Sequence, residues 1–313
     1  MVDDAWSEAD LAVLSRQVLG GRPVVDVRPL TGGYRNANTR VTCGDGERYV
    51  LRRYRDGAAC VVERDVLARL SGGPVPVPEV LYADPDGALF SSALLVTRFV
   101  PGVPGDRVLA GGAAEDSAAL GRAMGTALAA VHAVTFPAPG FLGPGLTVSG
   151  GSPATGLGEY VARELPAGNA AAAFDPAELA ALTALANRQA PLVERVSAQS
   201  HLVHGDYNPK NVLAERHGDG WRLTAVLDWE FALVATPLFD VGNVLRFAPD
   251  RPPGFEEGFV TGYTEAGGVL PDGWREISRA VDLFALVQFL THPPEHRYFQ
   301  KSVRLLRSRL SAG

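Results

Sequence analysis

One short segment of the chain, His204-Gly205-Asp206-x4-Asn211, combines residue types that suit phosphoryl transfer. A carboxylate such as that of Asp206 can orient an attacking hydroxyl group and accept its proton. The oxygens of Asn211 and of Asp228, farther along the chain, suit Mg²⁺, because this ion prefers carboxylate and carbonyl ligands. We therefore predict that Asp206 is a catalytic base and that Asn211 and Asp228 are ligands of Mg²⁺.

Two short apolar runs with the character of β-strands, at residues 201–203 and 222–227, lie on either side of this segment. Because side chains alternate along a strand, Val226 and Asp228 share one face, and Asp228 can project from the strand end into a cleft. The alternative is a surface turn, since His, Gly, Asp, Asn and Pro all favour turns. The pairing of both patterns with β-like runs favours the catalytic interpretation.

Residues 1–100 show the pattern of a sheet accompanied by helices. Helices are expected at residues 7–19 and at residues 60–70, where a Ser-Gly-Gly-Pro sequence ends the second one. The turn formers Pro101-Gly102 and Pro104-Gly105 end this region, so we place a domain boundary there. The expected strands are residues 24–30, 38–42, 48–54, 79–83 and 88–100.

Residues 101–313 are richer in helical patterns. Within residues 116–133, apolar side chains such as Leu120, Met124 and Leu128 recur at helical spacing. Residues 137–157 are dense in Gly and Pro and should form loops. Further helices are expected from Asp175-Pro176, from Asp240, and over residues 255–265 and 274–290. We therefore predict an N-terminal nucleotide-binding lobe, residues 1–100, and a C-terminal catalytic and substrate-binding lobe, residues 101–313.

The composition is that of a globular chain of 313 residues, 46% of them apolar and 20% charged. A core of this size needs no disulfide or structural metal, and the two cysteines have no CxxC spacing. The net charge of −6 argues against non-specific nucleic-acid binding and mildly favours a cationic partner. We see no apolar run of ~18 residues that could span a bilayer and no signal-peptide pattern. A cytoplasmic enzyme is expected; the oligomeric state is not indicated.

Three motifs taken together resemble the aminoglycoside phosphotransferase/choline kinase-type small-molecule kinase family: His204-Gly205-Asp206-x4-Asn211, Leu227-Asp228-Trp229-Glu230 and Pro237-x2-Asp240. The resemblance covers nearly the whole chain. It implies an α+β, bilobal, protein-kinase-like fold, with an antiparallel sheet plus helix in the N-lobe and a mainly helical C-lobe. It also implies that ATP and Mg²⁺ bind in the cleft between the lobes, and that the γ-phosphate is transferred to a hydroxyl of a small molecule.

Residues of the N-lobe match the family's nucleotide site more loosely. Gly32 and Gly33 lie between two strands, where a kinase places a loop over the phosphates, although a plain hairpin is the alternative. Val50 and Arg52 share one strand face, so that Val50 would line the adenine pocket. The family usually has a phosphate-anchoring lysine at the position of Arg52; arginine keeps the charge and can bind two phosphate oxygens.

Other residues follow from the kinase resemblance. Glu63 would pair with Arg52, although an ordinary exposed helix carboxylate is the alternative. The backbone groups of Thr97 and Phe99 resemble the hinge and would pair with the adenine edge. His204 is expected to position the catalytic loop by hydrogen bonding. Asp240 either braces that loop or caps a helix.

The sequence says less about the acceptor. Acidic residues slightly outnumber basic ones within residues 145–200 and 251–300, the expected substrate walls, and such an excess would attract a polyamine-like molecule. Our leading hypothesis is O-phosphorylation of a cationic antibiotic, an aminoglycoside or a basic cyclic peptide, which would confer resistance. The first alternative is a metabolic kinase for choline, an amino alcohol, homoserine or a sugar. The second is a nucleotide-binding pseudokinase. A cluster of three carboxylates would favour the antibiotic, and an aromatic cage would favour choline.

Overall fold

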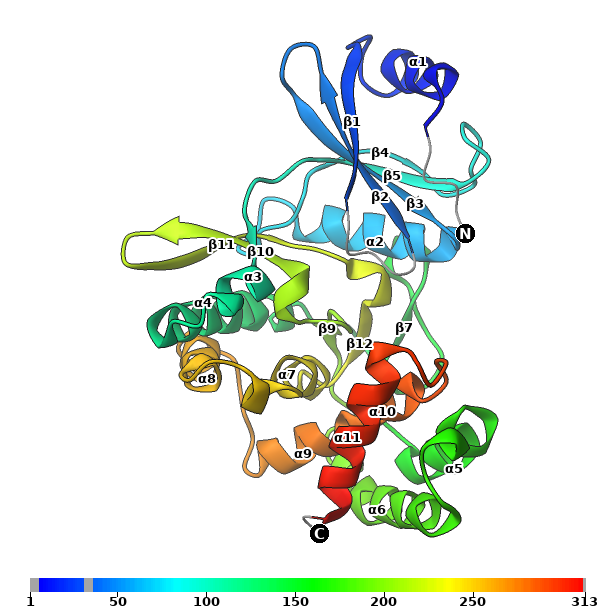
Figure 1. The fold of residues 1–313 in the computed structure, drawn as a ribbon, viewed down its shortest axis with the longest axis vertical. Helices are drawn as coiled ribbons and strands as arrows, with labels where there is room; N and C mark the ends of the chain where they lie inside the picture. The colour runs from blue at the N-terminus through cyan, green and yellow to red at the C-terminus, as the bar shows by residue number, and fades with distance from the viewer. Residues whose placement is uncertain (1–5, 31–35, 312–313) are drawn as a thin grey trace.

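The computed structural model of the chain describes residues 6–30 and 36–311. Its N-terminal part is a five-stranded antiparallel sheet with the strand order β1-β2-β3-β5-β4 (Figure 1). The strands are β1 (Val24–Leu30), β2 (Ala37–Cys43), β3 (Arg48–Tyr54), β4 (Val80–Asp84) and β5 (Ala93–Arg98). The predicted antiparallel sheet is confirmed.

Two elements, β5 and α2, begin at other residues than predicted because of local hydrogen bonds. β5 begins at Ala93 and not at residue 88, because the Asp84 carboxylate accepts hydrogen bonds from two backbone N–H groups that follow it and holds them in a turn. Helix α2 (Gly57–Leu70) begins before the predicted residue 60, because Asp56 caps its first turn. Helix α1 (Glu8–Gln17) begins at a capping box, within the predicted range.

The sheet packs against a different partner on each face. Leu94 of β5 belongs to a core cluster with Leu14 of α1, whereas the next residue, Leu95, belongs to the larger core cluster together with Val66 of α2. Such alternation is what a strand between two layers requires. The larger cluster continues into the C-terminal helices. Packing therefore fixes α2 against the C-terminal part of the chain.

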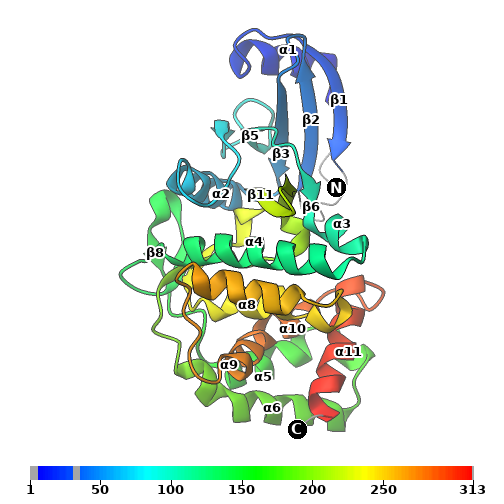
Figure 2. The ribbon, with the colours of Figure 1, turned by 90° about the vertical axis from the view of Figure 1, so that its left-hand side faces the viewer.

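The C-terminal part is mainly helical, as predicted (Figures 1 and 2). Its helices are α3 (Gly105–Ala110), α4 (Ala114–His132), α5 (Leu157–Ala167), α6 (Pro176–Glu194), α7 (Leu238–Leu245), α8 (Phe255–Glu265), α9 (Trp274–Val281), α10 (Leu283–Phe289) and α11 (Arg297–Ser311). Short strands form two small sheets: β6 (Val103–Pro104), β7 (Gly140–Leu142), β8 (Val148–Ser149), β9 (His201–Val203), β10 (Val212–His217), β11 (Gly220–Val226) and β12 (Leu233–Ala235). Within the described part of the chain, no helix is long and apolar enough to cross a membrane.

Several C-terminal elements differ from the prediction. The helix expected over residues 274–290 is two helices, which meet at Asp282, and this buried carboxylate binds two arginines. Residues 137–157, expected to be loop, contain the short strands β7 and β8. β10 and α11 were not predicted. The sequence does carry a signal for α11, because Phe299, Val303 and Leu306 are buried and recur at helical spacing.

Helices α4 and α8 lie side by side in close contact (Figure 2). A Cβ atom added to Gly125 of α4 would lie 2.1 Å from the carbonyl oxygen of Phe259 in α8. A Cβ atom added to Gly262 of α8 would lie 2.2 Å from the carbonyl oxygen of Arg122 in α4. Glycine therefore permits the close approach of the two backbones. This packing helps to position the C-terminal end of α4, where His132 contributes to the site described below.

Replacement of Gly125 by alanine should destabilise the protein, because the added methyl group forces α4 away from α8. We expect the free energy of unfolding to fall by about 1–3 kcal/mol, measured by denaturant titration. Gly151→Ala is the matched control, since a Cβ atom at Gly151 meets no atom within 4 Å. Equal stability of the Gly125→Ala variant and the wild type would contradict the tight packing.

Candidate active site

The predicted base lies in the loop that follows β9. Gly205, directly before Asp206, has a φ of +83°, and a Cβ atom there would lie 2.3 Å from the carbonyl oxygen of Phe231. Glycine is therefore required for the chain to turn so closely against its neighbour. Asp206 follows this turn with a partly exposed side chain, whereas the preceding His204 is buried.

Asp240 of α7 holds this loop from behind. Asp240 is fully buried, and its carboxylate accepts hydrogen bonds from the backbone N–H groups of His204 (2.7 Å) and Gly205 (3.0 Å). His132 contacts the same carboxylate, with Nε2 3.2 Å from Oδ2. Of the two roles considered for Asp240, the loop brace is confirmed. Asp240 does not cap α7, because Pro237 occupies the N-cap position and no side chain caps this helix.

The imidazole of His204 joins the two halves of the motif. Its Nε2 lies 2.8 Å from the carbonyl oxygen of Leu227, and its Nδ1 accepts a hydrogen bond from the backbone N–H of Asp206 at 3.2 Å. These contacts assign the neutral tautomer that carries its proton on Nε2. The predicted positioning role of His204 is therefore confirmed.

Side-chain amides surround the Asp206 carboxylate. Oδ1 accepts a hydrogen bond from Nδ2 of Asn208 at 2.9 Å, and Oδ2 accepts one from Nδ2 of Asn211 at 3.0 Å. Nδ2 of Asn243, on α7, lies 3.5 Å from Oδ1. Because amide N–H groups donate to both oxygens, they hold the carboxylate in one position. Asn208 and Asn243 were not predicted as site residues.

The predicted metal ligands are brought together by backbone pairing. The N–H of Leu227 donates to the carbonyl oxygen of Asn211 at 2.8 Å, so the residue before Asp228 is fixed beside the catalytic loop. Asp228 itself has a φ of +70°, in the left-handed region. Asp is one of the few non-glycine residues that tolerate this region, and such strain is concentrated at functional sites.

Arg52 of β3 faces three carboxylates. Its Nη2 contacts Oδ1 of Asp228 and lies 3.2 Å from Oε1 of Glu230, while its Nε lies 3.5 Å from Oε2 of Glu63. Glu63 is on α2, so the cluster joins the sheet, the helix behind it and the C-terminal part of the chain. The predicted pairing of Glu63 with Arg52 is present, and Glu63 is buried. Glu63 also accepts a hydrogen bond from the Tyr54 hydroxyl at 2.6 Å.

Burial and the Arg52 guanidinium act in opposite directions on the pKa values of these carboxyl groups. Burial raises the pKa of Glu63 and of Glu230, and Arg52 offsets only part of that effect. At Asp228 burial also acts to raise the pKa, but the Arg52 guanidinium outweighs it and holds the pKa below its usual value. Asp228 is therefore the carboxylate of this cluster that ionises most readily, and a metal ligand needs that state.

The predicted adenine-facing residues lie on adjacent strands. Val50 of β3 is opposite Thr97 of β5 in the sheet register. The backbone N–H of Phe99 donates to the carbonyl oxygen of Arg48 at 3.0 Å. This donor is therefore already used within the sheet, and pairing it with adenine would require that hydrogen bond to break. Gly32 and Gly33 lie outside the described residues.

The donor set of Asn211 and Asp228 suits Mg²⁺. The Asn211 amide nitrogen donates to the carbonyl oxygen (2.9 Å) and to Oδ2 (3.0 Å) of Asp206, so its amide oxygen faces away from Asp206. An amide oxygen and a carboxylate are hard ligands, and Mg²⁺ commonly keeps water at its other positions. In residues 6–30 and 36–311, no group of three or more His, Cys, Asp or Glu side chains could hold a metal ion.

Comparisons with known proteins agree with this geometry. The sequence profile of the phosphotransferase enzyme family (APH) matches residues 26–278. No curated protein sequence matches the chain significantly.

Solved structures with the same fold include three antibiotic-modifying enzymes. A thermostable mutant of aminoglycoside phosphotransferase APH(4)-Ia, in a ternary complex with AMP-PNP and hygromycin B, is 20% identical with a TM-score of 0.69, over 98% of this chain and 99% of that chain. The macrolide 2'-phosphotransferase MphH from Brachybacterium faecium is 20% identical with a TM-score of 0.64, over 96% and 98%. APH(2")-IIia, in a complex with GDP and kanamycin, is 16% identical with a TM-score of 0.69, over 97% and 98%. The predicted kinase-like α+β fold is confirmed.

Replacement of Asp240 by alanine should destabilise the protein and misplace the catalytic loop, because two buried N–H groups lose their acceptor. We expect a loss of about 3 kcal/mol in the free energy of unfolding, measured by denaturant titration. Asp272→Ala, at an exposed position, should have little effect. If Asp240→Ala were as stable as the wild type, the hydrogen bonds of Asp240 would not stabilise the fold.

Proposed function

The chain belongs to the phosphotransferase enzyme family and is a small-molecule phosphotransferase, and from this premise we propose that it transfers the γ-phosphate of ATP to a hydroxyl group, with Asp206 as the base. The acceptor oxygen forms a bond to the γ-phosphorus, the bond between that phosphorus and ADP breaks, and the hydroxyl proton passes to Asp206. The observation that carries this proposal is the hydrogen bonding of Asp206. Both of its oxygens are held by the amides of Asn208 and Asn211, so its position is fixed before an acceptor arrives.

The nucleotide is proposed to bind above this loop, against the sheet. Arg52 takes the place of the family's phosphate-anchoring lysine, and Glu63 orients its guanidinium. Gly32 and Gly33 are proposed to cover the phosphates, and Val50 to line the adenine pocket. At the hinge we propose contacts from the backbone groups of Thr97 and Phe99. The N–H of Phe99 donates to the carbonyl oxygen of Arg48, so its contact with adenine would require that hydrogen bond to break.

Mg²⁺ is proposed to bind through Asn211 and Asp228, where it would neutralise charge on the phosphate groups. Arg52 is one cation against three carboxylates, so their combined formal charge is −2 before a metal binds. A divalent cation balances that charge. The residues for base, metal and phosphate binding are all present, which argues against the pseudokinase alternative.

The acceptor is proposed to be a small alcohol from one of two sources. An antibiotic is one candidate, since the structures described above are named for hygromycin B, kanamycin and macrolide phosphotransferases. Five of the twelve acids in residues 145–200 and 251–300, which suggested a cationic acceptor, form ion pairs with arginines. These pairs are Glu164–Arg163, Glu178–Arg307, Glu256–Arg275, Glu265–Arg122 and Asp282 with Arg246 and Arg309.

This pairing weakens the case for a polycationic antibiotic, because a paired carboxylate attracts a second cation weakly. Choline is not favoured either. The rings of Phe289 and Tyr298 stack on each other, with centroids 5.1 Å apart, and Lys210 lies over Tyr298 at 5.1 Å. A protein cation thus already occupies the aromatic surface that a quaternary ammonium group would need. A cytoplasmic location, predicted from the sequence, would supply the ATP.

Asp206→Asn should lower kcat by about 10²–10⁴-fold, because the amide cannot accept the hydroxyl proton. ADP release should be measured with a panel of aminoglycosides, choline, homoserine and sugars, and AMP-PNP affinity by calorimetry. Nucleotide affinity should stay within about twofold of the wild type, since Asp206 is not among the residues proposed to bind the nucleotide. Asp219→Asn, on an exposed turn, is the control. Turnover that survives in Asp206→Asn would remove Asp206 from the role of base.

A further inference from the structure

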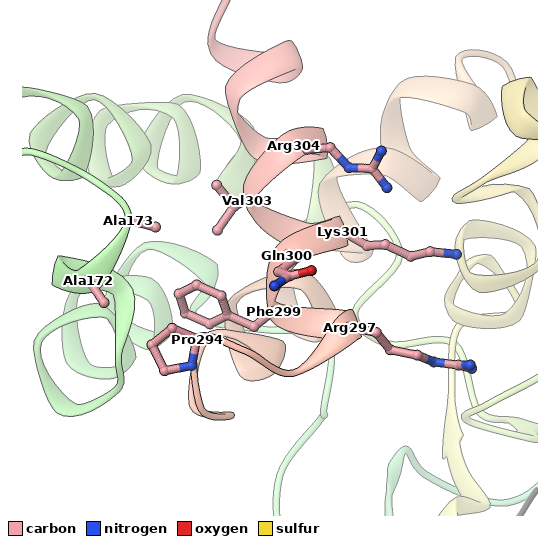
Figure 3. A pocket seen from close by; sticks show the side chains of 9 residues that line it. All are labelled: Ala172, Ala173, Pro294, Arg297, Phe299, Gln300, Lys301, Val303 and Arg304. Atoms are coloured by element: carbon pink, nitrogen blue, oxygen red, sulfur yellow. The ribbon is translucent and has the colours of Figure 1, made fainter.

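Helix α11 presents a row of cations on one face. Its sequence contains five basic residues and no acidic one. Arg297, Lys301 and Arg304 are spaced so that they share a helix face. Figure 3 shows these three side chains extending to the same side of α11, away from Ala172 and Ala173. They help to line a groove with a volume of about 620 Å³.

This row is connected to the catalytic loop on one side. Lys210, within the same loop as Asp206, contacts the hydroxyl of Tyr298 through Nζ. Tyr298 is the second residue of α11, and its hydroxyl also accepts a hydrogen bond from Nη2 of Arg297 at 2.9 Å. The N-terminal end of α11 therefore lies directly against the loop that carries the base.

A second connection passes through α7. Asn243 of α7 reaches the Asp206 carboxylate, as described above. Phe247 follows one helical turn later, and the Lys301 Nζ lies 4.8 Å from the centre of its ring. The end of α7 thus connects the Asp206 carboxylate, through Asn243, with Lys301 of α11, through Phe247.

The positive charge is not balanced by nearby carboxylates. Arg307 and Arg309 of α11 bind Glu178 and Asp282, but Lys210, Lys301 and Arg304 have no carboxylate oxygen within 4.0 Å in the described part of the chain. The acid nearest in sequence to Lys301 and Arg304 is Glu295, which is exposed.

Arg251 is a further cation, close in sequence to Phe247. Arg251 packs over the Phe255 ring at 4.3 Å, and its Nη1 is buried without a hydrogen-bond partner in the described residues. Burial and the neighbouring Arg246 together lower the pKa of Arg251 to about 10, with Asp250 acting in the opposite direction. A buried guanidinium nitrogen with no partner adds to the positive potential on this side of the cleft.

We propose that the acceptor is an anionic alcohol, whose phosphate or carboxylate group is bound by Lys301 and Arg304 while its hydroxyl is presented to Asp206. This inference rests on the proposed kinase function and names its substrate class. Arginine binds such groups through a planar fork of N–H donors, and lysine acts as a point charge. A cationic acceptor would instead meet like charges at this wall.

A solvated helix face is the ordinary alternative for surface cations. The full chain, saturated with AMP-PNP and Mg²⁺ to block the nucleotide site, can distinguish the two. Calorimetric titration of inorganic phosphate, and separately of spermidine, should be compared between the wild type, Lys301→Gln/Arg304→Gln and Arg188→Gln. Arg188 is an exposed arginine on α6 and serves as the matched control. AMP-PNP affinity, measured first in all three proteins, tests the kinase function independently.

Phosphate should bind at one site, about tenfold more weakly in Lys301→Gln/Arg304→Gln and within about twofold of the wild type in Arg188→Gln. The proposal is overturned if phosphate does not bind, if both variants lose binding equally, or if spermidine binds the wild type more tightly than phosphate does. Failure of AMP-PNP to bind the wild type would instead overturn the kinase function.

Discussion

The interaction on which the site depends is the contact of a single guanidinium, that of Arg52, with three carboxylates from two separate segments of the chain. Glu63 comes from α2, and Asp228 and Glu230 follow β11. Burial opposes the ionisation of all three, and Arg52 is the cation that compensates it. Because Arg52 lies on β3, the same contact fixes the sheet over the C-terminal part of the chain.

From this cluster a chain of hydrogen bonds leads to the base. Leu227, next to Asp228, is held by Asn211 and by His204, and both of these residues contact Asp206. Asp240 anchors the loop from the buried side. The proposed metal ligand, Asp228, and the proposed base, Asp206, are thus joined by one hydrogen-bonded network, and such a network can position groups before the reacting atoms meet.

The proximity of Asp206, Asn211 and Asp228 could be predicted because these residues lie in two short motifs that flank neighbouring strand-like runs. The contact between Arg52 and Glu230 could not, because it joins positions 178 residues apart that only the packed fold brings together. The engagement of the Phe99 N–H depends on the register of β3 against β5, which composition does not encode. The expectation of an acidic acceptor wall was drawn from counts of charge. Those counts do not reveal that some of the acids pair with arginines of other helices, as Glu256 does with Arg275 and Glu178 with Arg307. In the described part of the chain, Lys301 and Arg304 form no ion pair with a carboxylate.

The most direct test of this account is calorimetric titration of AMP-PNP with Mg²⁺ into the wild type, Arg52→Lys and Arg52→Met, with thermal unfolding as the control for folding. The account predicts that Arg52→Met binds the nucleotide about 100-fold more weakly, because three carboxylates then face the phosphates without a cation. Arg52→Lys should be intermediate, since it keeps the charge and loses the fork. A folded Arg52→Met variant that binds AMP-PNP as tightly as the wild type would contradict the central role of Arg52.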